Sequence, residues 1–193
     1  MTPNGSQSED LRVQRTNKLI LEALLELTAQ KGFSALTVSD ITKYAGINRA
    51  TFYRHYQDKF DLLKTYAQTV FEMLEDEPQR SNEVGDHQMY TGLIKIFEHI
   101  RANAKFYRVM LGKNGDAAFT DKIRQYIRKR IRRSLPADLQ KDKASIDLYV
   151  AYSSSASVGA VLWWLEHEFP YSSEEMVILI RQLELGSLLS MLR

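Results

Sequence analysis

Cysteine is absent from this 193-residue chain. The protein therefore forms no disulfide, and both thiolate catalysis and thiol redox sensing are excluded. Long apolar runs are missing too, since the longest, residues 158–165, is too short to cross a bilayer. The opening residues are polar and include Pro3 and Gly5. We expect no signal peptide, no membrane partner and a disordered tail over residues 1–12.

An excess of charge of one sign is also nearly lacking, because 26 Lys/Arg side chains face 24 Asp/Glu and the net charge is +2. Charge alone therefore does not indicate a nucleic-acid partner. The sequence contains no Gly-rich phosphate loop, metalloprotease motif or nucleophile elbow, and its four histidines lack close metal spacing. We expect no enzyme activity, no cofactor and no metal.

Apolar residues recur at helical spacing along nearly the whole chain, and no alternating strand pattern persists. The sequence predicts an all-α protein of about nine helices. Outside the segment described next, the predicted helices cover residues 13–31, 59–75, 87–103, 105–112, 116–134, 142–168 and 173–191. Gly112, Gly115, Pro136 and Pro170 separate the later ones, and the polar stretch 78–86 is a predicted loop.

The most informative segment runs from Thr37 to Tyr56 and is typical of two short helices joined by a tight turn. Ile41 and Ala45 share one face of the first helix. Gly46 follows, where a positive φ can end that helix. Asn48 can then cap the second helix, because its side chain can accept a hydrogen bond from a free backbone amide.

The second of these helices has two contrasting sides. Phe52 and Tyr56 lie at i, i+4 and are predicted to point into the core. The other faces carry Arg49, Ala50, Thr51, Tyr53, Arg54 and His55. A short helix with an apolar inner edge and a polar outer edge fits a DNA major groove.

With its flanks, this segment resembles the tetracycline-repressor (TetR) family of bacterial transcription regulators. The resemblance covers residues 14–64: the stretch 20–33 is similar to the family's first helix and the Gly-Phe turn after it, and the stretch 53–63 to the junction between the recognition helix and the fourth helix. An ordinary helical hairpin is the competing interpretation, but residues across the whole stretch match in order and spacing.

The resemblance implies a helix-turn-helix domain over residues 13–65 and a helical effector-binding and dimerisation domain over 66–193. It also implies a cytoplasmic, nucleoid-associated bacterial protein that binds palindromic double-stranded operator DNA as a homodimer. We expect the fourth helix to be the only segment that directly joins the two domains.

Most of the candidate DNA contacts have a chemical reason. Thr37 precedes the first helix of the segment, so its hydroxyl or backbone amide can meet a phosphate. Arg49 can reach guanine O6 and N7 or a phosphate, and Ala50 lets the helix approach the groove. In the family, positions matching Thr51, Tyr53 and Lys59 usually bind phosphate, whereas Arg54 and His55 depart from its common variants. The full candidate set is Thr37, Val38, Asn48, Arg49, Ala50, Thr51, Tyr53, Arg54, His55 and Lys59.

The last two helices are apolar on most faces over residues 146–165 and 176–192, which favours burial on more than one side. A second copy of the chain can supply one of those sides, and a monomer core is the alternative. The candidate interface residues are Ser153, Ala156, Ser157, Gly159, Ala160, Leu183, Ser187 and Ser190.

Aromatic and methionine side chains in the second domain are candidates for an effector pocket, although each is a core residue in the simpler interpretation. They are Phe97, Phe106, Tyr107, Met110, Phe119, Tyr126, Tyr149, Tyr152 and Trp163. The stretch 106–119 is loosely similar to regulators of dihydroxyacetone-kinase operons within the same family. At least one branch of those regulators answers to a protein co-regulator.

Three functions therefore compete. The first is a repressor released by an unknown small-molecule effector, and the second is a DNA-binding regulator controlled by a protein partner. The third is a helical interaction module that no longer binds DNA. A basic run over residues 122–133 is either a solvated helix face or a contact for DNA, an anionic effector or an acidic partner.

Overall fold

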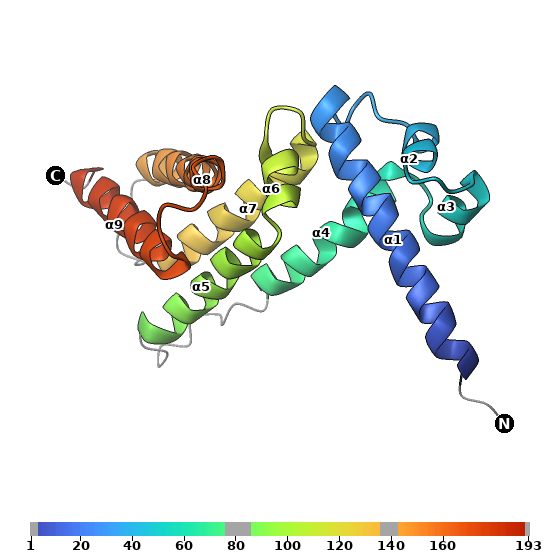
Figure 1. Ribbon diagram of the computed structural model, residues 1–193. Coiled ribbons are helices and arrows are strands. Elements are labelled where there is room, and N and C mark those ends of the chain that lie inside the picture. The colour runs from blue at the N-terminus through green and yellow to red at the C-terminus, as the bar shows by residue number, and fades with distance from the viewer. Residues whose placement is uncertain (1–3, 76–85, 136–142, 192–193) are drawn as a thin grey trace. The chain divides into compact units, whose positions relative to one another are not determined.

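The computed structural model describes residues 4–75, 86–135 and 143–191, and these ranges are helices joined by short turns (Figure 1). The all-α prediction is confirmed for them. The helices are α1 Asn4–Lys31, α2 Val38–Tyr44, α3 Arg49–His55, α4 Lys59–Glu75, α5 Asp86–Ala102, α6 Ala104–Leu111, α7 Ala117–Ser134, α8 Lys143–Glu166 and α9 Ser173–Met191.

The predicted helix boundaries agree closely with these bounds from α4 onward. The fourth helix has the predicted ends, and α5 to α9 begin and end within two residues of their predicted positions. The predicted loop 78–86 lies outside the described residues except for Asp86, which begins α5.

The first helix differs from its prediction, because α1 begins at Asn4 and residues 4–12 belong to it rather than to a disordered tail. The polar composition of this stretch suggested disorder. Extending an already formed helix adds one hydrogen bond for each residue that is fixed, so a polar stretch can join a helix that nucleates elsewhere.

The chain forms two compact units, and each unit consists of two separate segments of the sequence. The first unit holds Met1–Val70 together with Lys113–Asp116, and the second holds Phe71–Gly112 and Ala117–Arg193. The first border therefore falls inside α4. The expectation that α4 alone joins the two units is wrong, because the four residues between α6 and α7 also belong to the first unit.

The first unit is built around apolar side chains from its four helices. Leu24 of α1, Ile41 of α2, Phe52 of α3 and Leu62 of α4 are all fully buried. Two helices of seven residues are too short to be stable alone, so this shared core holds α2 and α3 in place.

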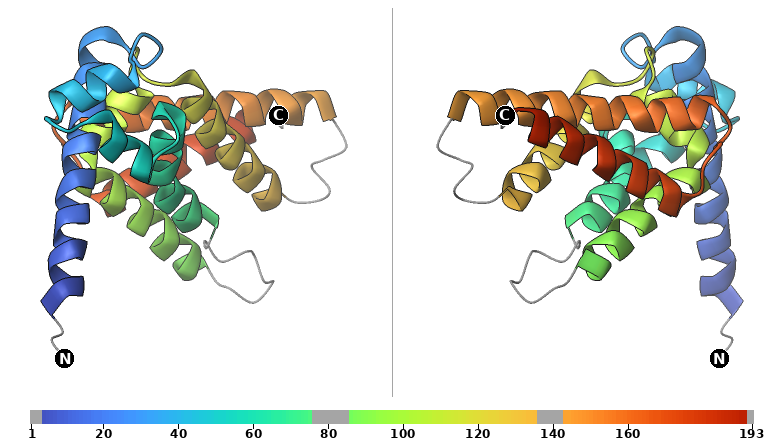
Figure 2. Two further views of the ribbon diagram at one scale, coloured as in Figure 1. Left: turned by 90° about the vertical axis from the view of Figure 1, so that its right-hand side faces the viewer. Right: turned by 90° about the vertical axis from the view of Figure 1, so that its left-hand side faces the viewer.

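In the second unit α8 is the central element and contacts α6, α7 and α9, while α5 also packs on α9. Trp164 of α8 is fully buried against Phe97 of α5, with ring centroids 5.4 Å apart. Figure 2 shows α8 and α9 together on one face of this unit.

Within the described ranges, no helix is both long enough and apolar enough to span a membrane. The same residues bring together no group of three or more His, Asp or Glu side chains that could hold a metal ion.

Candidate DNA-binding interface

The start of α2 is fixed by a reciprocal cap. The Asp40 amide donates to Thr37 Oγ1 at 3.2 Å, and the Thr37 amide donates to Asp40 Oδ2 at 2.9 Å. The Thr37 hydroxyl donates to the same oxygen at 2.6 Å. Both donors of Thr37 are therefore engaged within the chain, and its first role is to cap α2 rather than to contact phosphate.

Asp40 also binds Lys31 of α1, whose Nζ lies 2.6 Å from Asp40 Oδ2. The hydrogen bond from Lys31, with smaller contributions from Thr37, lowers the pKa of Asp40 to about 2. The carboxylate is thus ionised at neutral pH and links two helices. The spacing Thr-x-x-Asp signals the cap, but no local pattern indicated that Lys31 would reach it.

The turn between α2 and α3 has the predicted features. Gly46 adopts a φ of 66°, in the left-handed region that glycine tolerates without strain. The Asn48 side chain accepts from the Thr51 amide at 2.8 Å and from the Thr51 hydroxyl at 3.1 Å. The predicted cap of α3 is confirmed, and the hydroxyl proton of Thr51 is directed back to this cap.

The recognition helix α3 has one buried and one exposed side. Phe52 is fully buried and Tyr56 nearly so, as predicted, and burial raises the pKa of the Tyr56 hydroxyl. The opposite side is open to solvent and presents Arg49, Ala50, Tyr53 and Arg54. Thr51 and His55 lie between, each half-buried. The geometry leaves two guanidinium groups and a phenol available to a partner molecule.

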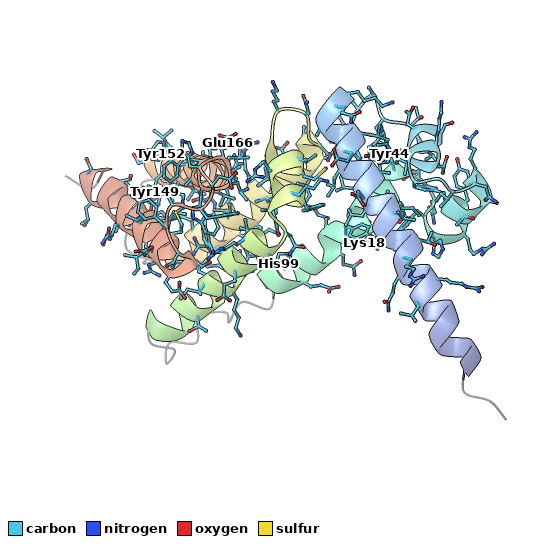
Figure 3. The ribbon with its side chains drawn as sticks, viewed as in Figure 1. Lys18, Tyr44, His99, Tyr149, Tyr152 and Glu166 are labelled. Atoms are coloured by element: carbon cyan, nitrogen blue, oxygen red, sulfur yellow. The ribbon has the colours of Figure 1, made fainter. Side chains whose placement is uncertain are left out.

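Two further exposed side chains of the helix-turn-helix segment were not selected from the sequence. Tyr44 and Lys43, in the last turn of α2, are both exposed, and Tyr44 is labelled in Figure 3. No sequence pattern distinguished them, since a polar or aromatic residue at the end of a short helix is common. Val38, in contrast, is half-buried at the start of α2.

Lys59 lies at the start of α4 and contacts the turn between α1 and α2. Its Nζ donates to the carbonyls of Phe33, Ser34 and Leu36 at 2.8, 2.9 and 2.8 Å. An ammonium group has three protons, so all of them are used inside the first unit. The phosphate contact inferred from the family resemblance remains a prediction, and the geometry favours a structural role.

Comparison with known families decides what this arrangement is. Residues 20–66 match the model described as "Bacterial regulatory proteins, tetR family", and residues 87–184 match one described as "Transcriptional regulator C-terminal region". The chain belongs to the TetR family. The members of this family are transcription regulators and not enzymes, in agreement with the expectation of no enzyme activity.

Two relatives with similar sequences are described as uncharacterised helix-turn-helix transcription regulators. YxbF of Bacillus subtilis, named as a helix-turn-helix regulator, is 45% identical over 60 residues, which are 31% of this chain and 16% of YxbF. YuxN of the same organism is 27% identical over 120 residues, covering 61% of this chain and 41% of YuxN. The chain therefore spans less than half of the length of either relative.

Solved structures share the TetR fold over most of the chain. A TetR regulator from Streptococcus agalactiae superposes with a TM-score of 0.62 at 22% identity, covering 93% of this chain and 99% of its own. DhaS, described as a dihydroxyacetone kinase operon activator, gives 0.54 at 20% identity, covering 89% and 95%. The looser similarity to the DhaS type is thus seen at the level of fold.

The predicted pocket residues of this TetR-family chain divide into two groups. Tyr149, like Phe97, Phe106, Tyr107, Met110 and Phe119, is buried in the second unit, and Tyr126 is half-buried. Tyr152 and Trp163 are exposed on α8 instead, and Figure 3 labels Tyr149 and Tyr152 on this helix. Residues three apart in an α-helix point about 60° apart around its axis, so Tyr152 lies beside the buried face that holds Tyr149 and outside it.

One polar pair lies among these aromatic rings. The rings of His99 on α5 and Tyr107 on α6 meet edge to face, with centroids 5.9 Å apart. Burial lowers the pKa of His99 and raises that of Tyr107, so both are neutral at pH 7.

The candidate dimer residues also divide. Ser153 and Ser157 face the interior of their own unit, where the Ser157 hydroxyl donates to the Ser153 carbonyl at 2.8 Å. They are therefore not available to a second copy. Ala156, Gly159, Leu183 and Ser190 are exposed, whereas Ala160 and Ser187 are half-buried.

The basic run on α7 is largely engaged within the second unit. Arg132 and Arg124 lie 2.7 Å from Asp147 and Asp121, and Arg130 lies 3.6 Å from Glu184. Arg128 donates to the Ser154 hydroxyl at 3.4 Å. The remaining cations of the run are Lys122, Lys129 and Arg133. These contacts favour a structural role for most of the run.

Proposed function

We propose that this protein is a homodimeric transcription regulator that binds a palindromic double-stranded operator through α3. The exposed side of α3 carries the proposal, since Arg49, Tyr53 and Arg54 project from a helix that Phe52 anchors from behind. Arginine at a base edge distinguishes guanine through O6 and N7, and a phenol can position the helix on a phosphate. The family membership supports this assignment.

The test is selection of bound duplexes from a random-sequence pool, followed by footprinting of the enriched sequence. The protein is expected to enrich a palindrome whose half-sites lie about one helical turn apart, ~34–36 Å. Recovery of no preferred sequence would contradict the proposal. A single enriched half-site without its symmetric mate would leave DNA binding standing but contradict the dimeric mode.

The homodimer forms through the exposed sides of α8 and α9. Leu148, Tyr152, Gly159 and Trp163 follow one another along α8 at helical spacing, and Leu148 is 71% exposed in the single chain. On α9, Ile178, Leu185 and Leu189 are exposed along a similar line, together with Leu183 at 69% exposure. Rows of exposed apolar side chains of this kind mark an interaction site.

The regulatory signal is a small molecule bound in the second unit, and its binding releases the operator. The buried aromatic residues and the neutral His99–Tyr107 pair offer apolar contacts and a few polar groups, the composition that small-molecule sites use. A metabolite screen by thermal shift, followed by operator titration with each hit, tests this. Absence of any compound that changes operator affinity would favour a protein co-regulator.

A further inference from the structure

The carboxyl end of α1 is closed by a residue from a distant part of the chain. The last carbonyls of a helix have no partner within it and need donors from elsewhere. Gly32, at a φ of 83°, donates its amide to the Thr28 carbonyl at 2.9 Å. The next carbonyl, that of Ala29, accepts from the Asn114 side-chain amide at 2.8 Å.

Asn114 makes a second hydrogen bond to the same place, because its backbone carbonyl accepts from the Phe33 amide at 2.9 Å. One residue thus satisfies an acceptor and a donor on either side of Gly32. Lys113–Asp116 lie between α6 and α7 and belong to the first unit, although Gly112 and Ala117 on either side belong to the second. The chain therefore returns to the first unit for four residues only.

Lys59 stabilises the same turn, because its Nζ donates three hydrogen bonds to the carbonyls of Phe33, Ser34 and Leu36. Helix α4, which carries Lys59, passes into the second unit after Val70. Each of the two segments that join the units, α4 and the loop after α6, therefore forms hydrogen bonds with the turn between α1 and α2. This turn is well packed, since Phe33 and Leu36 are each 1% exposed.

The turn leads directly into the DNA-binding elements. Thr37, the cap of α2, follows Leu36, and the Lys31–Asp40 ion pair joins the same two helices. The Ile47 amide, before α3, donates to the Thr42 carbonyl of α2 at 3.0 Å. Packed elements move as units rather than deform continuously, so a shift of the turn moves α2 and α3 with it.

We propose that Asn114 is a positioning residue for DNA recognition, which holds the turn between α1 and α2 from a loop anchored at both ends in the second unit. It touches no DNA and acts through the placement of α2. The proposal rests on the DNA binding proposed above. It gives the second unit a route to the recognition helix that is separate from α4.

The experiment compares binding of the full-length protein to two duplexes, the one enriched by the wild-type protein and a scrambled duplex of equal length. Asn114→Ala removes the donor to the Ala29 carbonyl, and Asn114→Asp replaces it with an acceptor that repels that carbonyl. Both are expected to lower affinity for the selected duplex about 3- to 10-fold, the effect of one lost hydrogen bond. Affinity for the scrambled duplex and the salt slope stay unchanged, because no phosphate contact is lost.

Lys113→Ala is the matched control, since Lys113 is exposed in the same loop and its removal leaves both hydrogen bonds of Asn114 intact. It is expected to leave affinity for the selected duplex within twofold of wild type. Equal affinity of Asn114→Ala and wild type for that duplex would overturn the proposal. So would an equal loss on both duplexes, which is the result of a merely structural role.

Amide exchange on the wild-type protein supplies a readout that does not depend on a folded variant. Binding of the selected duplex is expected to slow exchange of the Phe33 amide, which donates to Asn114. Unchanged exchange at Phe33 would overturn the proposal even while the duplex binds. Failure of the wild-type protein to prefer any duplex would instead remove the proposed function, and this proposal with it.

Discussion

Lys31 Nζ, in the last residue of α1, lies 2.6 Å from Asp40 Oδ2 in the first turn of α2. The same oxygen accepts from the amide and the hydroxyl of Thr37. A single carboxylate oxygen therefore ties the end of one helix to the cap and first turn of the next. Protonation of Asp40 would weaken all three contacts at once.

The stability of the first unit is therefore expected to depend on the ionisation of Asp40. The Lys31 and Thr37 hydrogen bonds lower the pKa of Asp40 from 3.8 to about 2 in the folded protein. A lowered pKa gives stability that is present above pH 3.8 and is lost as the pH falls through about 2. Asp40→Asn should thus unfold at lower urea than wild type at pH 5, and the gap should close towards pH 2. A gap that is constant with pH would contradict this account.

Replacement of Lys59 is expected to affect folding more than DNA contact. Lys59→Met keeps the length of the side chain but leaves three carbonyls without their shared donor. We expect a loss of about 1–3 kcal/mol in the free energy of unfolding, measured by urea denaturation, and an unchanged salt slope of operator binding. A stable variant whose salt slope of operator binding falls by ~0.9 would instead show that Lys59 contacts a phosphate.

Arg49 is expected to read bases from the first turn of α3. Arg49→Ala should relax the preference at one operator position by about 1–3 kcal/mol, if the guanidinium binds guanine through two hydrogen bonds. Binding titrations against single-base variants of the selected operator measure this. Lys64→Ala, which removes an exposed cation from α4, is the control for charge alone. A uniform loss across all operator variants would make Arg49 a phosphate contact instead.

Substitutions on the exposed side of α8 are expected to break the dimer without damage to the monomer fold. A Cβ built on Gly159 meets no atom within 4 Å in the single chain, so Gly159→Leu crowds only a surface outside that chain. Leu148→Asp places a charge on the same side. Sedimentation at micromolar concentration should show monomers for both α8 variants. It should show dimers for the control Leu11→Asp, which changes an exposed residue of α1. A dimer that persists in both α8 variants would contradict the proposed surface.

The sequence was sufficient to predict the structural features that depend on residues close together in the chain. The positive φ at Gly46, the Asn48 cap and the burial of Phe52 and Tyr56 each follow from spacings of a few residues. Helix ends could be read for the same reason, since Gly and Pro act locally. The class of protein followed from the order of such features over residues 14–64.

Contacts between distant residues could not be read in this way. Lys59 reaches carbonyls 23 to 26 residues away and Asn114 reaches one 85 residues away, and neither pairing leaves a local pattern. Ser153 and Ser157 share a small-residue stretch with Gly159, yet the direction of each around α8 depends on where α7 and α9 pack. Only the folded arrangement tells the inward serines from the outward glycine.

The four residues Lys113–Asp116 have a consequence for how such regulators can be recombined. A chimera that joins the first 70 residues to the effector region of a relative would leave the Ala29 carbonyl and the Phe33 amide without Asn114. A hybrid gene must therefore carry two separated stretches of sequence to transfer one intact DNA-binding unit. The exchangeable module in this protein is continuous in space but interrupted in its coding sequence.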